Sequence, residues 1–218
     1  MPGVICAAVL AVLSTPAGFT DNLPEALKSA KERNRNVFMV CSGSDWCGWC
    51  QRLEQEVLSS QTFLDNMTNE FELVYIDMPN DKSRISGWGK KHNEEVCVKY
   101  GVKGFPTCYI LDADGKTVGR MGYEAGGADK YSKTVKYLKE NQADIDKYIM
   151  PIVKKVDALT VTMNKMYRLG GMEKVKKMCK PKLEKLIKEA EGLKLPDNIA
   201  EEKGKLLEDL KQLLATME

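Results

Sequence analysis

Short apolar runs alternate with longer mixed segments between residues 37 and 121. The runs Val37–Cys41, Leu73–Ile76 and Thr107–Leu111 are continuously apolar or nearly so, as expected for strands buried on both faces. The turn at 112–115 and the run Lys116–Met121 complete an antiparallel hairpin with the third strand. The pattern therefore predicts an α/β domain.

In the segments between these strands, apolar residues recur at helical spacing. The predicted helices begin after Asp21, run over 47–59, 90–100 and 128–148, and leave the polar stretch 77–89 as a loop. Strands separated by helices favour a sheet with helices packed on its faces.

A different pattern begins at Met150-Pro151. Residues 152–218 predict three amphipathic helical stretches, broken at Gly170-Gly171 and again at 195–197. Pro181 is expected to begin a helix, because proline is favoured at the first helical position. We interpret residues 150–218 as an all-helical C-terminal extension, either a packed structural element or a docking module for a substrate or partner.

The first twenty residues carry no charge. The apolar run Val4–Leu13 is shorter than the about 20 residues that span a bilayer, and small residues around Ala17 follow it. We predict a signal peptide over 1–18, a periplasmic or secreted mature protein without a membrane span, and a main domain over 19–149. No Lys or Arg precedes the run, so a buried first strand is the alternative.

The overall charge is close to balanced, with 33 Lys and Arg residues against 31 Asp and Glu residues. No basic patch is interleaved with aromatic residues, so we expect no nucleic-acid partner. A chain of 218 residues is long enough for one medium domain and a smaller appendage.

The candidate chemistry lies in Ser44–Cys50, directly after the first strand. Cys47 and Cys50 are three residues apart at the start of a predicted helix, where the helix dipole lowers a cysteine pKa. Cys47, at the N-terminus of the predicted helix, is expected to be the nucleophile, and Cys50 is expected to be the resolving thiol. This arrangement indicates thiol–disulfide exchange.

Metal binding is the alternative chemistry for the Cys47–Cys50 pair. A structural zinc site needs a second ligand pair, whereas the only histidine is His92 and no second Cys-x-x-Cys occurs. We therefore expect no metal and no cofactor beyond the cysteine pair. A copper or metal chaperone, which would retain stoichiometric metal, and a non-catalytic interaction protein, which would not reduce insulin, remain the rival interpretations.

A second motif, Gly104-Phe105-Pro106-Thr107, precedes the third strand. Together with the cysteine pair it resembles the thioredoxin superfamily over roughly residues 21–142. The likeness extends to bacterial exported thioredoxin-like disulfide reductases and isomerases related to the C-terminal domain of the thiol–disulfide interchange protein. This resemblance implies a thioredoxin fold, a central mixed sheet flanked by helices, with a cis Phe105–Pro106 bond facing the cysteine pair.

The resemblance also implies a reaction and its partners. It favours a protein-disulfide reductase or isomerase that acts on protein thiols and disulfides and exchanges electrons with an upstream donor or acceptor. The residues expected to shape substrate binding, or to tune the reduction potential, are Trp46, Gly48, Trp49, Phe105 and Pro106.

The usual proton acceptor for the resolving thiol is missing from this sequence. Thioredoxins carry a buried Asp six residues before the first cysteine, where this chain has Cys41. Glu54, one helical turn after Cys50, resembles an acidic residue that influences the cysteine pKa in the interchange-protein domain, although an exposed helix glutamate is the alternative.

The remaining cysteines are expected in the interior. We predict that Cys41 and Cys108 are buried free thiols in contact with each other, on neighbouring antiparallel strands beneath the active-site helix. Cys97 and Cys179 are interpreted as small apolar core residues, and His92 as a surface residue.

Overall fold

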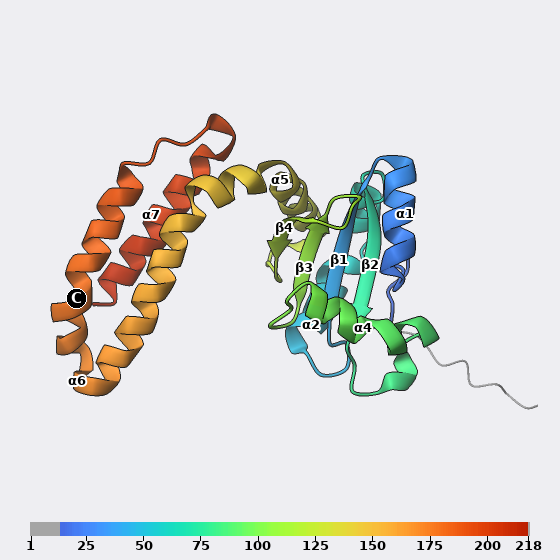
Figure 1. Cartoon of the computed structure of the whole chain (residues 1–218), viewed down its shortest axis with the longest axis horizontal. Helices are drawn as coiled ribbons and strands as arrows, with labels where there is room; N and C mark the ends of the chain where they lie inside the picture. The colour runs from blue at the N-terminus through green and yellow to red at the C-terminus, as the bar shows by residue number, and fades with distance from the viewer. Residues whose placement is uncertain (1–13, 218) are drawn as a thin grey trace, which may run out of the picture. The chain divides into compact units, whose positions relative to one another are not determined.

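A computed structural model describes residues 14–217, so most of the predicted leader, residues 1–13, lies outside the described part. The centre of the fold is a four-stranded mixed sheet in the order β2-β1-β3-β4 (Figure 1). β1 (Asn36–Ser42) is parallel to β2 (Phe71–Asp77) and antiparallel to β3 (Thr107–Leu111), which pairs with β4 (Thr117–Met121). The predicted α/β class and strand positions are confirmed.

Helices cover both faces of the sheet. One face packs against α1 (Leu23–Arg33) and α4 (Gly87–Lys99). The other packs against α2 (Gly48–Leu53), the π-helical turn η1 (Glu54–Leu58), α3 (Gln61–Met67) and the first turns of α5 (Gly127–Tyr148). Successive side chains of β1 alternate between these two cores, which is why the whole strand is apolar.

Helix boundaries differ locally from the predictions. α3 was not predicted, α4 begins at Gly87 instead of Lys90, and a 3₁₀ turn, η2 (Lys82–Arg84), occupies the expected loop. Asn22, not Asp21, caps α1 by accepting from the Glu25 backbone N–H. Ser86 caps α4 in the same way, and that cap explains the earlier start.

The register of β1 and β3 overturns the predicted contact between two cysteines. Cys41 lies opposite Thr107, and Cys108 lies opposite Val40. A one-residue offset sends side chains to opposite faces. Cys41 therefore packs on the α1 and α4 side and Cys108 on the α2 side. Both are buried free thiols as predicted, but the predicted pairing is wrong.

The chain divides into two compact units, one ending at Lys139 and the other beginning at Glu140. The second unit contains α6 (Met150–Glu191), a 3₁₀ turn η3 (Asp197–Ile199) and α7 (Ala200–Ala215). The helical path of α6 is interrupted at Gly170-Gly171, as predicted, where Gly171 has a φ of +65°. Pro181 lies inside the second half of α6 and does not begin it, so that prediction was wrong.

The second unit has an apolar core of its own. The stripes predicted from helical spacing are buried in part, and α6 packs against α7. The core includes Cys179, Leu183, Ile199, Leu206 and Leu210. Within residues 14–217, no helix is long and apolar enough to cross a membrane.

Candidate functional site

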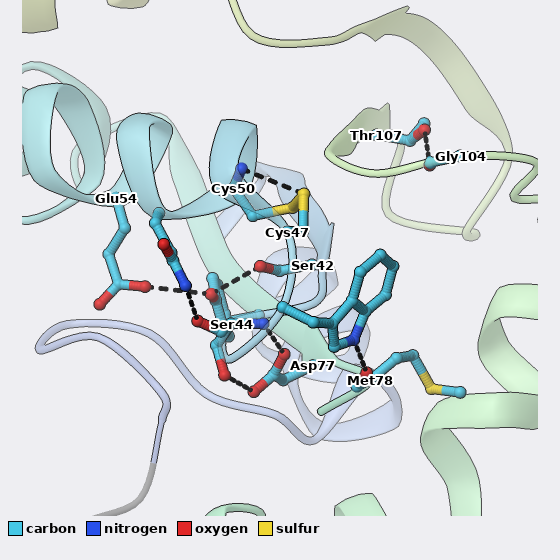
Figure 2. The surroundings of a disulfide bond; sticks show 12 residues. Ser42, Ser44, Cys47, Cys50, Glu54, Asp77, Met78, Gly104 and Thr107 are labelled. Carbon is cyan, nitrogen blue, oxygen red and sulfur yellow. Dashed lines mark hydrogen bonds between the residues drawn. A yellow bond between two sulfur atoms is a disulfide. The ribbon is translucent and has the colours of Figure 1, made fainter. Parts of the chain in front are cut away.

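Cys47 and Cys50 are joined by a disulfide at the start of α2, with their Cα atoms 5.2 Å apart (Figure 2). Cys47 is the N-cap residue of α2, and its Sγ accepts a hydrogen bond of 3.2 Å from the Cys50 backbone N–H. Cys47 is 7% exposed and Cys50 is 2% exposed. Cys47 is therefore the more accessible residue of the disulfide, and its Sγ accepts a backbone hydrogen bond.

The loop between β1 and α2 is held by backbone and side-chain contacts. The Cys47 N–H donates to the Gly43 carbonyl at 2.8 Å. A Cβ on Gly43 would lie 2.4 Å from the Trp46 ring, so glycine is required there. Asp45 accepts from the backbone N–H groups of Asn80 and Asp81 at 2.9 Å each, and these bonds lower its pKa. Asp45 thus fixes the neighbouring loop to the site.

A polar network lies beside α2 on the same face of the sheet. The Tyr75 hydroxyl is hydrogen-bonded to Ser42 Oγ at 2.8 Å and donates to Glu54 Oε2 at 3.2 Å (Figure 2). Burial raises the pKa of Glu54, although the Tyr75 hydrogen bond opposes the shift. Burial also raises the pKa of Tyr75, so its hydroxyl keeps its proton. Glu54 is half-buried, not a freely solvated helix residue.

A second buried carboxylate, Asp77, ends β2 next to this network. It accepts from the Ser44 backbone N–H at 2.9 Å, from Ser44 Oγ at 2.6 Å and from Ser14 Oγ. Its backbone carbonyl accepts from Asn93 Nδ2 of α4 at 2.8 Å. Asp77 therefore fastens the active-site loop to the end of β2 and, through its backbone, to α4.

Aromatic side chains surround the disulfide on two sides. Trp46, 48% exposed, packs edge-on against Phe105 with ring centroids 5.4 Å apart, and its Nε1 donates to the Met78 carbonyl. Trp49, 57% exposed, lies 5.4 Å from the Tyr123 ring, and Arg52 lies over both rings. We name these four aromatic residues the aromatic rim.

The loop that carries Pro106 lies in the surroundings of the disulfide, where Thr107 Oγ1 donates to the Gly104 carbonyl (Figure 2). The Phe105–Pro106 peptide bond is cis. A cavity of about 560 Å³ adjoins it, lined by Lys103, Gly104, Phe105, Pro106, Thr107, Arg120, Met121 and Gly122. The sequence-predicted residues Trp46 and Phe105 thus meet, while a Cβ added to Gly48 would have no atom within 4 Å.

Four described cysteines are free and buried. Cys41 and Cys97 of α4 lie in the same core, on the face of the sheet that packs against α1 and α4. Cys108 Sγ accepts from the Tyr131 hydroxyl at 3.3 Å, and burial raises the pKa of Cys108 to about 12. Cys179 belongs to the second unit.

Sequence reasoning missed the roles of Tyr75, Asp77 and Tyr123. A polar residue at the end of a buried strand was the available signal for Asp77. His92 is outside the site, as predicted, and contacts Glu95. In the part of the chain that the structure describes, no three His, Cys, Asp or Glu side chains gather in a way that could hold a metal ion.

Known proteins resemble this chain in sequence. Residues 23–151 match the thioredoxin-like domain family. The disulfide bond reductase DsbH of Chlamydia pneumoniae is 33% identical over 116 residues, which cover 53% of this chain and 69% of that protein. The thioredoxin-related protein DsbJ of the same organism is 26% identical over 98 residues, covering 45% of this chain and 28% of DsbJ.

A solved structure has a fold similar to that of this chain. A structure described as DsbH oxidoreductase superposes with a TM-score of 0.52 at 28% identity, covering 64% of this chain and 94% of the other. The family match spans more than half of the chain, and the Cys47–Cys50 disulfide fits a Cys-x-x-Cys thiol–disulfide oxidoreductase site. The chain belongs to the thioredoxin-like family of disulfide oxidoreductases.

Proposed function

We propose that this protein is a disulfide reductase that acts on protein disulfides through Cys47 and Cys50. One observation carries the proposal: a closed Cys47–Cys50 disulfide at a helix start, with the more accessible sulfur at the N-cap. The similarity to a protein named as a disulfide bond reductase supports reduction as the direction.

The first step is the attack of Cys47 on a substrate disulfide. In the reduced enzyme the Cys47 thiolate accepts the Cys50 backbone N–H, a bond that favours the charged form and lowers the thiol pKa. The thiolate bonds to one substrate sulfur, and the other substrate sulfur leaves as a thiolate and takes up a proton. The product is a mixed disulfide on Cys47.

The second step releases the substrate. The Cys50 thiol loses its proton and attacks the Cys47 sulfur, so that the Cys47–Cys50 disulfide forms and the second substrate thiol leaves. We assign the proton to Glu54, which lies one turn along the helix and is held by the Tyr75 hydroxyl. Its raised pKa brings this carboxylate closer to a pKa suited to general-base work near neutral pH.

The aromatic rim is proposed to receive the polypeptide around the target disulfide. Trp46, Trp49 and Phe105 offer rigid apolar surface next to Cys47, and large aromatic side chains dominate binding energy at such surfaces. Pro106 and the adjoining cavity would accept the extended substrate chain. An upstream thiol donor would then reduce the Cys47–Cys50 disulfide for the next cycle.

We further propose that the protein works outside the cytoplasm and that residues 1–18 are a cleaved leader. The apolar run and the Dsb-type relatives support export. Ser14, in the described part of this leader, donates to Asp77, and cleavage near Ala17 would leave Asp77 with its two Ser44 hydrogen bonds. N-terminal sequencing of the mature protein tests this: a first residue upstream of Ser14 contradicts it.

Insulin reduction tests the activity. With dithiothreitol as electron donor, the wild-type protein should accelerate precipitation of the insulin B chain, and the Cys47→Ser variant should not. An equal rate with both proteins, or with neither above the dithiothreitol background, would reject the proposed function. Metal analysis of the same wild-type preparation distinguishes a metal chaperone, which would carry about one metal ion per Cys-x-x-Cys pair.

A further inference from the structure

The cavity beside the cis Phe105–Pro106 bond carries charge of one sign. Two of the residues that line it, Lys103 and Arg120, are cations, and no carboxylate of the described residues lines it. Both cations are exposed, and no ion pair within residues 14–217 involves either of them. The cavity, of about 560 Å³, therefore presents two positive charges that the surrounding residues do not neutralise.

The cavity adjoins the aromatic surface next to Cys47. Gly104 and Thr107, which line the cavity, lie in the surroundings of the disulfide (Figure 2). Phe105 also lines the cavity, and its ring packs against Trp46 with the ring centroids 5.4 Å apart. One loop thus borders both the cysteine pair and the two cations.

Strand pairing places Arg120 on the same face of the sheet as the ring of that loop. Arg120 of β4 lies directly opposite Tyr109 of β3. Tyr109 belongs to the core on the α1 and α4 side, and Phe105 packs against that core. Directly opposed residues of paired strands share a face, so Arg120 lies on the face where Phe105 packs. Lys103 lies two residues before Phe105 in the same loop.

The carboxylates near the disulfide lie on the other side of β1 and already have hydrogen-bond partners. Asp77 ends β2, and Glu54 is bonded to Tyr75 of the same strand. Asp45 accepts from two backbone N–H groups of the loop that follows β2. Since the strand order is β2-β1-β3-β4, the anions lie on the β2 side of the site and the cations on the β3 and β4 side. A polypeptide that crosses the site therefore meets opposite charges on its two sides.

We propose that the protein selects disulfides of acidic polypeptide segments, in which an Asp or Glu side chain near the attacked cysteine binds at the cavity, between Lys103 and Arg120. The inference rests on the proposed reductase function and adds a substrate class to it. Ammonium and guanidinium groups both donate charge-assisted hydrogen bonds to a carboxylate. A basic side chain in the same place would meet two like charges, so the cavity discriminates by repulsion as well as by attraction.

Competition between matched peptides tests this preference. Three symmetric disulfides are made from otherwise identical one-cysteine peptides, with Glu, Gln or Lys on both sides of the cysteine. An equimolar mixture is offered to the full-length Cys50→Ser variant, which holds the captured peptide on Cys47, and the adducts are counted by mass spectrometry after acid quenching. The same mixture treated with 2-mercaptoethanol, an uncharged thiol, gives the intrinsic reactivity of each peptide, by which the adduct ratios are divided.

The Glu peptide is expected to be captured about fivefold more than the Gln peptide, the size typical of exposed ion pairs. The Lys peptide is expected to be captured least. The preference should shrink when the salt concentration is raised from about 0.05 M to about 0.5 M, because added ions screen exposed charges.

Variants in the same Cys50→Ser background locate the preference. Lys103→Gln with Arg120→Gln should bring the Glu to Gln ratio close to one. Lys103→Glu with Arg120→Glu should reverse the order and favour the Lys peptide, a result that loss of structure cannot produce. Lys28→Gln with Lys91→Gln is the matched control: it removes the same charge from exposed residues of α1 and α4 that do not line the cavity. This control should keep the wild-type preference.

Each remaining outcome would overturn the proposal. Equal capture of the three peptides would reject the acidic preference and leave the reductase function standing. A Glu preference that persists without Lys103 and Arg120, or that is lost equally in the Lys28 and Lys91 control, would place the determinant elsewhere. Capture of none of the peptides would also reject it, and insulin reduction by the wild-type protein would then show whether the proposed function fails as well.

Discussion

The two cysteine pairs of the first unit differ in how the chain brings them together. Cys47 and Cys50 are neighbours in sequence on one helix turn, are joined as a disulfide, and lie beside exposed aromatic side chains. Cys41 and Cys97 come from a strand and a distant helix, are free thiols, and are buried in the same core. The first pair thus borders exposed aromatic surface, whereas the second pair is enclosed by core side chains.

Alternation along β1 accounts for the separation of the two sites. Cys41 and Ser42 are consecutive residues, yet Cys41 packs in the core with α1 and α4 while Ser42 joins the Tyr75 and Glu54 network beside α2. One strand thus supplies a polar network to the active-site face and a thiol to the other face. The predictions below test whether these two faces act separately.

The largest contrast in activity is expected between the Cys47→Ser and Cys97→Ser variants. Cys47→Ser should lower insulin reduction by at least about 100-fold, because no other thiol can form the mixed disulfide. Cys97→Ser should stay within about twofold of wild type under reducing conditions, since distant sites act independently. A comparable loss in both variants, measured in one assay, would show that the two pairs do not work separately.

Trapping separates the roles within the Cys47–Cys50 pair. Cys50→Ser should accumulate mixed disulfides through Cys47, because no resolving thiol remains. Cys47→Ser should accumulate few, since Cys50 is the less exposed sulfur. Non-reducing electrophoresis after acid quenching reports the adducts, and equal trapping by both variants would contradict the assignment.

A tenfold effect is expected from the carboxylate beside the site. Glu54→Gln should lower the insulin reduction rate by about tenfold, because the buried carboxylate no longer accepts the Cys50 proton. Wild-type activity should rise with pH as Glu54 ionises, at a higher pH than an exposed glutamate would require, since burial raises its pKa. The variant should lack this part of the pH profile.

Glu95→Gln is the matched control for that experiment. Glu95 is an exposed carboxylate on α4 that lies 3.3 Å from His92 Nδ1. Its replacement should leave both the rate and the pH profile unchanged. If Glu54→Gln shows the wild-type profile as well, Glu54 has no role in proton transfer.

A smaller effect is expected from the aromatic rim. Trp49→Ala should raise KM for a protein disulfide about fivefold, the loss expected when an exposed aromatic contact worth about 1 kcal/mol is removed. Reduction of a small disulfide should not change, because such a substrate does not reach the rim. Tyr167→Ala, which removes an equally exposed ring in the second unit, is the control; an equal KM increase there would contradict a local role.

The smallest effect concerns stability. The pKa of Glu54 is raised in the folded state, so its contribution to stability is present at low pH and is lost as pH rises through the folded pKa. Glu54→Gln should therefore be more stable than wild type at pH 7, by less than about 1 kcal/mol for a half-exposed charge, and equal to it at pH 3. Urea unfolding at both pH values measures this, and a variant less stable at pH 7 would contradict the assignment.

Features encoded locally were predictable from the sequence. The strands follow from apolar runs, and the Cys47–Cys50 disulfide follows from two cysteines one turn apart at a helix start. The interruption at Gly170-Gly171 follows from the glycines themselves.

Features that depend on long-range register were not predictable. The partner of Cys41 depends on a one-residue offset between β1 and β3, which no local pattern encodes. The link between Glu54 and Tyr75 joins a helix to a strand twenty-one residues away. Pro181 stands inside a helix because tertiary packing of α6 outweighs the local preference of proline.

The reduction potential of the Cys47–Cys50 pair tests the central claim most directly. Equilibration of the protein with glutathione redox buffers, followed by alkylation and mass analysis of the peptide that carries Cys47 and Cys50, gives this potential. A disulfide reductase should have a potential in the range of thioredoxin and the glutaredoxins, about −270 to −200 mV. A value near about −120 mV, typical of a strong disulfide oxidant, would contradict the account.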